Sequence, residues 1–121
     1  MKKINNSPDE DDEQVAFTDY LETQGIKYFA VPNGGHRNKL TAAKLKSLGV
    51  KAGVPDIVIL AKSASGKHDV LFVEMKRQEG GQISNKQKEW HEWLDVNDYA
   101  ICVAEGCMHA IRLLNMYLTK Y

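Results

Sequence analysis

Three residues of this 121-residue chain have the types and the spacing to form a catalytic site: Asp56, Glu74 and Lys76. Glu74 and Lys76 belong to the apolar segment VLFVEMK. Alternate side chains of a strand point to the same face, so this carboxylate and this ammonium would lie side by side. Asp56 directly precedes a second apolar segment, IVIL. Antiparallel pairing of the two segments would bring Asp56 and Glu74 together at one end of a hairpin.

Two converging carboxylates repel each other unless a positive group joins them. Mg²⁺ is a hard cation that one or two carboxylates, water and phosphate oxygens bind. A cation of this kind acidifies bound water and neutralises charge on phosphorus, which is the chemistry of phosphodiester hydrolysis. Lys76 could orient the attacking water, accept its proton, or stabilise the phosphate, and the sequence leaves these roles open.

The elements that position these residues follow from periodicity and from turn residues. Gly25, the segment PNGG and Gly80-Gly81 interrupt the apolar patterns, and Ser84 with Gln87 fits a capping box. The patterns predict helices over about 12–23, 41–47, from 84 onward and 108–118, and strands over 27–31, 57–60, 70–76 and 99–104. We therefore expect one α/β domain over residues 10–121 after an unstructured lead-in over residues 1–9.

The charges are distributed unevenly, although the formal net charge is zero. Residues 9–13 read DEDDE, whereas 23–55 contain no acid and several basic residues. A basic block of this kind can attract a polyanion such as DNA. The two cysteines match no zinc pattern and no disulfide framework. No signal peptide or membrane-length apolar segment occurs, so we expect a cytoplasmic protein without a membrane or an organic cofactor.

The segments GVPDIVIL and VLFVEMKR resemble those of the PD-(D/E)xK nuclease superfamily. Over about residues 10–118 the chain resembles, more specifically, the virus-type replication-repair nuclease (VRR-NUC) family. The supporting segments are VPNGGHR, LKSLGVKAGVPD and FVEMKRQEGGQISNKQKEW, in that order. The resemblance implies a restriction-endonuclease-like core of αβββαβ order, here with a small helical insertion and a closing C-terminal helix.

The resemblance also assigns roles to the residues at the two strand ends. Asp56, Glu74 and the backbone carbonyl of Met75 would be metal ligands, and Lys76 would be the catalytic lysine. The metal would be Mg²⁺, with Mn²⁺ as a substitute.

Two further site residues follow from the same resemblance. Gln87 matches a glutamine of the family on the helix after the catalytic strand, although it could serve only as the capping partner of Ser84, or do both. An acidic residue on the first helix completes the family's site. We choose Glu13, with Glu10 as the competitor, because the acidic run blurs the alignment.

Small stand-alone members of the family resemble phage proteins that act as homodimers on branched DNA, including four-way (Holliday) junctions, in DNA repair. We therefore expect a metal-dependent deoxyribonuclease of this kind. The alternatives are a flap or general duplex nuclease and an inactive module that binds DNA structures. The expected DNA contacts are Asn33, Arg37, Lys39, Lys44, Lys46 and Lys51.

The histidines and tryptophans receive no chemical role from the sequence. The histidines match neither a histidine–metal spacing nor a His-Asn-His nuclease spacing, and the tryptophans are interpreted as core or interface residues. These residues are His36, His68, His91, His109, Trp90 and Trp93.

Overall fold

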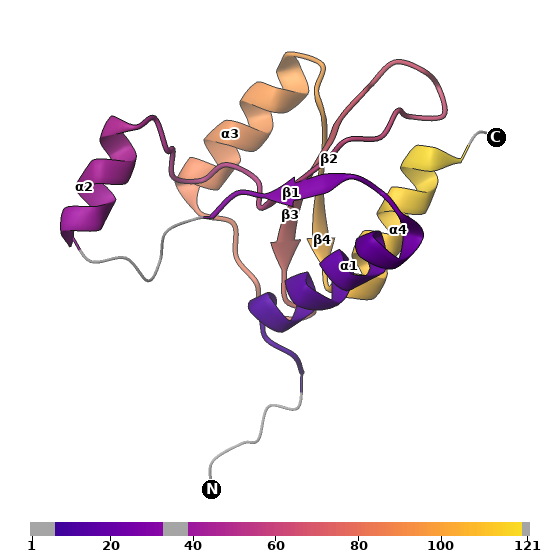
Figure 1. The fold of residues 1–121 in the computed structure, drawn as a ribbon, viewed down its shortest axis with the longest axis horizontal. Coiled ribbons are helices and arrows are strands. Elements are labelled where there is room, and N and C mark those ends of the chain that lie inside the picture. The colour runs from indigo at the N-terminus through magenta and orange to yellow at the C-terminus, as the bar shows by residue number, and fades with distance from the viewer. Residues whose placement is uncertain (1–6, 33–38, 120–121) are drawn as a thin grey trace, which may run out of the picture.

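The computed structural model of the protein describes residues 7–32 and 39–119. Its elements are α1 (Glu10–Gln24), β1 (Tyr28–Ala30), α2 (Lys39–Ser47), β2 (Ile57–Ile59), β3 (Leu71–Lys76), α3 (Asn85–Val96), β4 (Ala100–Glu105) and α4 (Cys107–Leu118). Helices α1 and α4 pack together against β3 and β4, α3 packs on β4, and α2 stands beside the body of the domain (Figure 1). The predicted αβββαβ core, with its inserted helix and its closing helix, is confirmed.

The strands form one mixed sheet in the order β1-β2-β3-β4. Pairing is antiparallel from β1 to β3, and β4 joins β3 in parallel after the crossover through α3. Ile57 pairs with Val73 across β2 and β3, so the register continues to place Asp56 opposite Glu74. The antiparallel pairing expected between these two strands is therefore confirmed.

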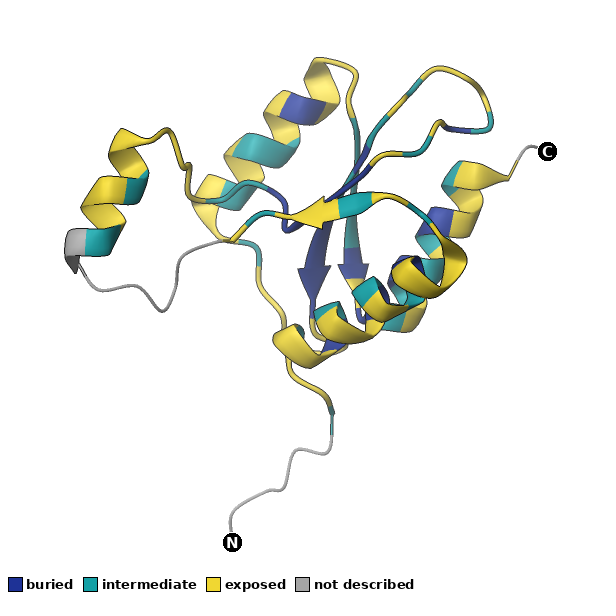
Figure 2. Cartoon of the chain, in the orientation of Figure 1, coloured by how far each residue is buried: buried dark blue, intermediate teal, exposed yellow. Residues whose placement is uncertain are grey.

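The two faces of β3 serve different purposes. Leu71, Val73 and Met75 enter the hydrophobic core, whereas Glu74 and Lys76 contact Gln87 on α3. Figure 2 shows β3 as a largely buried strand. The other core side chains come from α1, β2, β4 and α4: Phe17, Leu21, Ile57, Ile59, Ala104, Ala110 and Leu114. The core therefore packs against one face of β3, and the opposite face carries Glu74 and Lys76.

Helix α1 has a defined cap at each end. Asp9 and Asp12 form a capping box at the start of α1, and Gly25 ends the helix in the left-handed conformation. Because Asp9 is the cap, α1 begins earlier than predicted and the acidic run forms its first turn, where the helix dipole favours negative charge. None of the helices in the described part of the chain has the length and apolarity that crossing a bilayer requires.

Gly53 lets the loop before Asp56 lie directly on the start of α3. Its φ is +89°, and a Cβ at this position would come 2.7 Å from the Lys86 carbonyl carbon and 2.8 Å from its oxygen. Both atoms are backbone and cannot move without shifting α3. The absence of a side chain at Gly53 therefore allows the loop that carries Asp56 to pack closely against the helix that carries Gln87.

We expect Gly53→Ala to lower the free energy of unfolding by about 2–4 kcal/mol, because it adds a backbone clash to the cost of a positive φ. Gly49→Ala is the matched control, since Gly49 has a φ of +94° and open space around it. Its loss should be about 1–2 kcal/mol. Urea unfolding of both variants measures the difference, and equal losses would show that the contact with Lys86 is unimportant.

Candidate active site

Three carboxylates from separate elements meet at the end of β3 that lies near the start of α1. Oxygen atoms of Glu10, Asp56 and Glu74 all lie within 4.8 Å of one another. Glu10 comes from the first turn of α1, Asp56 from the residue before β2, and Glu74 from β3. Lys76, two residues after Glu74, lies on the same face of β3. The arrangement has the oxygen donors and the charge of a site for a divalent cation.

A backbone hydrogen bond fixes Asp56 at this point. Its Oδ2 accepts a hydrogen bond from the Met75 N–H at 2.7 Å. Met75 lies beyond the part of β3 that pairs with β2, so Asp56 takes the place of a strand partner there. The N–H and C=O of a strand residue lie on the same side of the strand, so the Met75 carbonyl also faces Asp56. Its position is compatible with the metal-ligand role that the sequence suggested.

Glu74 is fully buried, and its carboxylate has two partners on α3. Oε2 accepts a hydrogen bond from Gln87 Nε2 at 3.2 Å, and Oε1 lies 3.3 Å from His91 Nε2. Burial raises the pKa of Glu74 from 4.5 to about 9, and Asp56 contributes to the increase through a hydrogen bond and through its charge. A cation in the cluster would relieve both causes.

Gln87 belongs to the capping box of α3 and also contacts two residues of the candidate site. Its N–H donates to the Ser84 hydroxyl, and its Oε1 accepts from the Ser84 N–H at 2.9 Å. The same Oε1 accepts from Lys76 Nζ at 3.1 Å, while Nε2 donates to Glu74. The capping box that starts the helix therefore also orients the lysine and one carboxylate. Of the interpretations left open by the sequence, the one in which both roles hold agrees with this geometry.

The choice of Glu13 over Glu10 needs correction. Glu13 is buried, but its Oε1 accepts from the Cys107 N–H at 2.9 Å and its Oε2 accepts from Gln78 Nε2 at 2.8 Å. Cys107 is the first residue of α4, and the N-cap, Gly106, has no side chain to cap that helix. Glu13 supplies the missing cap from α1, so its carboxylate is already in use away from the cluster.

Glu10 instead reaches the cluster from the same helix. Its pKa is raised chiefly by burial and further by Asp56, while Lys76 lowers it. The capping box of Asp9 and Asp12 was a sequence signal for the start of α1, but it places Glu10 and Glu13 together in the first turn and so does not choose between them.

His91 was given no role from the sequence, yet it contacts Glu74. Burial, followed by the charge of Lys76, lowers its pKa, which favours the neutral imidazole, and Nε2 lies 3.3 Å from Glu74 Oε1. Position i+4 from Gln87 was the available signal, since residues four apart share a helix face.

The residues predicted to contact DNA are only partly within the described structure. Lys44 and Lys46 are exposed on α2, and Lys51 is exposed in the loop that follows. Asn33 and Arg37 lie outside the described residues, as does the side chain of Lys39. Of the core and interface interpretations of Trp93, the core one does not apply, because its side chain is 52% exposed and stacks on the exposed ring of Tyr99; the interface role stays a prediction.

Comparisons with known proteins point to one family. The sequence model of the VRR-NUC domain matches residues 9–107. A solved structure described as "VRR_NUC domain protein" is similar with a TM-score of 0.75 and 28% sequence identity, over 93% of this chain and 89% of that chain. No curated protein matches the chain. The matched segment contains the acidic cluster together with Lys76 and Gln87.

The raised pKa of Glu74 predicts that the metal-free protein loses stability as the pH increases. The folded state keeps a proton that the unfolded chain releases above its pKa of 4.5. The stabilisation is complete below that pH and is lost progressively up to about pH 9. Urea unfolding in EDTA at a series of pH values measures it. Glu74→Gln cannot ionise and should have a flatter profile, whereas parallel profiles would contradict the prediction.

The two acids of α1 should separate in their effects. Glu13→Ala removes the cap of α4 and should lower the free energy of unfolding by about 1–2 kcal/mol. Glu10→Ala removes one of three crowded carboxylates, so it should leave stability within about 0.5 kcal/mol of wild type and weaken Mn²⁺ binding. Urea unfolding and Mn²⁺ titration calorimetry measure the two effects. The reverse pattern would restore Glu13 to the site.

Proposed function

Because this chain belongs to the VRR-NUC family and is thus a nuclease of the PD-(D/E)xK type, we propose that it is a Mg²⁺-dependent DNA endonuclease in which Mn²⁺ can replace Mg²⁺. Its preferred substrates are branched DNAs, four-way junctions included, and its working form is a homodimer. The observation that carries the proposal is the convergence of the Glu10, Asp56 and Glu74 carboxylates beside Lys76.

The donor set fits a hard divalent cation. Carboxylate oxygens are the ligands that Mg²⁺ prefers, and the carbonyl of Met75 adds a neutral oxygen on the same side. Burial of Glu74 among other acids is costly without a cation, as its raised pKa indicates. The chemistry that such an ion supplies is the acidification of water and the neutralisation of charge on a phosphate.

The protein's own residues would hold and orient the reactants. Met75 N–H, Gln87 and His91 keep the carboxylates in place before substrate arrives, so no reorganisation is needed during the reaction. Gln87 also accepts a hydrogen bond from the Lys76 ammonium and so orients this positive charge, which would face the phosphate of the substrate. We assign Lys76 the stabilisation of the negative charge that develops on the phosphate during hydrolysis.

The DNA partner and the homodimer follow from charge and size. Lys44, Lys46 and Lys51 form an exposed basic surface to which phosphates can bind, and such binding weakens as salt increases. One domain of this size has little surface with which to hold a branched duplex. A symmetric pair would double that surface and place two sites for two symmetric cuts.

The proposal predicts that the purified protein cuts labelled four-way junctions in Mg²⁺ or Mn²⁺ and cuts nothing in EDTA. Asp56→Ala and Glu74→Ala should reduce cleavage by at least about 100-fold, and Lys76→Ala by a similar factor, because each removes a preorganised charge from the site. Gel electrophoresis of end-labelled DNA measures the products, and circular dichroism confirms that the variants are folded.

Other outcomes have distinct meanings. Cleavage of flaps or linear duplex at the same rate as junctions would reject the junction preference and leave the nuclease intact. DNA binding without cleavage in either metal would reject the enzyme in favour of a binding module. A single monomeric species on DNA in analytical ultracentrifugation would reject the homodimer.

A further inference from the structure

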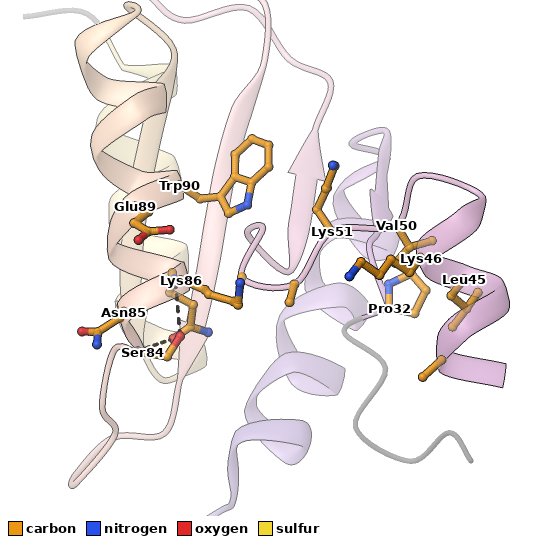
Figure 3. A pocket seen from close by; sticks show the side chains of 14 residues that line it. Pro32, Leu45, Lys46, Val50, Lys51, Ser84, Asn85, Lys86, Glu89 and Trp90 are labelled. Carbon is orange, nitrogen blue, oxygen red and sulfur yellow. Dashed lines mark hydrogen bonds between the residues drawn. The ribbon is translucent and has the colours of Figure 1, made fainter. Parts of the chain in front are cut away.

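A cleft of about 800 Å³ lies between α2 and α3, next to the catalytic cluster (Figure 3). Its walls are α2 with the loop that follows it, and the first half of α3. The lining residues that matter for binding are Lys46, Lys51, Lys86, Gln87, Glu89 and Trp90. Gln87 lines the cleft and also contacts Glu74 and Lys76, so one side chain separates the cleft from the carboxylate cluster.

The cleft combines an aromatic surface with positive charge. Trp90 is half-buried, and its indole extends from α3 toward Lys51 across the cleft (Figure 3). Lys46, Lys51 and Lys86 supply three positive charges, against one negative charge from Glu89. Aromatic rings that stack on bases, set among lysines that contact phosphates, are the two components of a surface for single-stranded nucleic acid.

We propose that this cleft holds an unpaired segment of the DNA strand next to the phosphate that is cut, with Trp90 stacking on one base. The inference rests on the proposed function and narrows its substrate to DNA that is unpaired beside the cut. A base inside a continuous duplex is stacked on both faces and offers none to an indole. Forks, flaps and open junction centres offer such a base, and their negatively charged strand complements the lysines.

Trp93 provides a matched control for Trp90. It is the next tryptophan on α3 and does not line the cleft; its ring stacks on Tyr99 with a centroid distance of 5.9 Å and contacts Trp90 edge to face at 6.4 Å. A general effect of removing an indole from α3, or of losing the contact between the two tryptophans, should therefore appear in both variants. A stacking effect should appear only in Trp90→Ala.

The test is fluorescence anisotropy of the full chain with labelled oligothymidine of about 12 nucleotides, in EDTA so that nothing is cut. Trp90→Ala should weaken this binding between about five-fold and a hundred-fold, and Trp93→Ala by less than about two-fold. Binding to a blunt duplex should change by less than about two-fold in both. An oligonucleotide without bases should bind wild type more weakly, by the same factor that Trp90→Ala weakens binding of the normal oligonucleotide. The Trp90→Ala variant should bind the two oligonucleotides equally well.

A second variant keeps the proposal testable if Trp90→Ala does not fold. Lys46→Ala with Lys51→Ala changes only exposed side chains and should reduce the slope of log affinity against log salt by about 1.4 for single strands. Equal losses on single strand and duplex, no effect of removing bases, or an unchanged salt slope would each overturn the proposal.

The failure of this inference and the failure of the proposed function are distinguishable. If the nuclease is correct and the cleft is not the strand site, wild type and Trp90→Ala will cut a DNA fork in Mg²⁺ equally well. If the chain does not cut DNA at all, binding that depends on Trp90 will still be measurable in EDTA.

Discussion

The repulsion among three carboxylates at one end of the sheet is the constraint on which this structure depends. Glu74 is fully buried within hydrogen-bonding distance of its helix partners, and Asp56 and Glu10 converge on it. The protein tolerates this arrangement because the Met75 N–H donates to Asp56, Gln87 Nε2 donates to Glu74, and the positive charge of Lys76 lies nearby. The crowding of these carboxylates lowers the stability of the metal-free fold and would also make the cluster bind a cation tightly. Such a conflict between function and stability is common in proteins.

Structural and chemical roles are joined in single residues around this point. Gln87 stabilises the start of α3 through its capping box with Ser84, and in the same conformation it contacts Lys76 and Glu74. Gly53 brings the Asp56 loop against the start of that helix. Glu13, by contrast, has a purely architectural contact with the start of α4. The site is therefore only as rigid as the helix starts that surround it.

The sequence predicted the fold because local chemistry and the global arrangement agree along most of the chain. Alternation in VLFVEMK, the turn before Asp56 and the capping pair Ser84–Gln87 each indicate their own element, and the pairing of β2 with β3 follows from them. The boundaries moved where a cap was missed, as at Asp9. The choice between Glu10 and Glu13 does not follow from that cap, because both acids lie in the first turn of α1.

By itself, the sequence determined that Asp56, Glu74 and Lys76 would meet, because strand alternation and the pairing of two apolar strands fix which way their side chains point; Gln87 was expected there only from the family resemblance. Only the tertiary structure decided between Glu10 and Glu13, brought His91 to Glu74, and formed the cleft beside Trp90. Those outcomes depend on how helices far apart in the chain pack against the sheet. Glu10 and Glu13 are three residues apart, almost one full turn, so their side chains leave α1 in nearly the same direction. The start of α4, which Glu13 contacts, therefore determines which of the two acids is left for the carboxylate cluster.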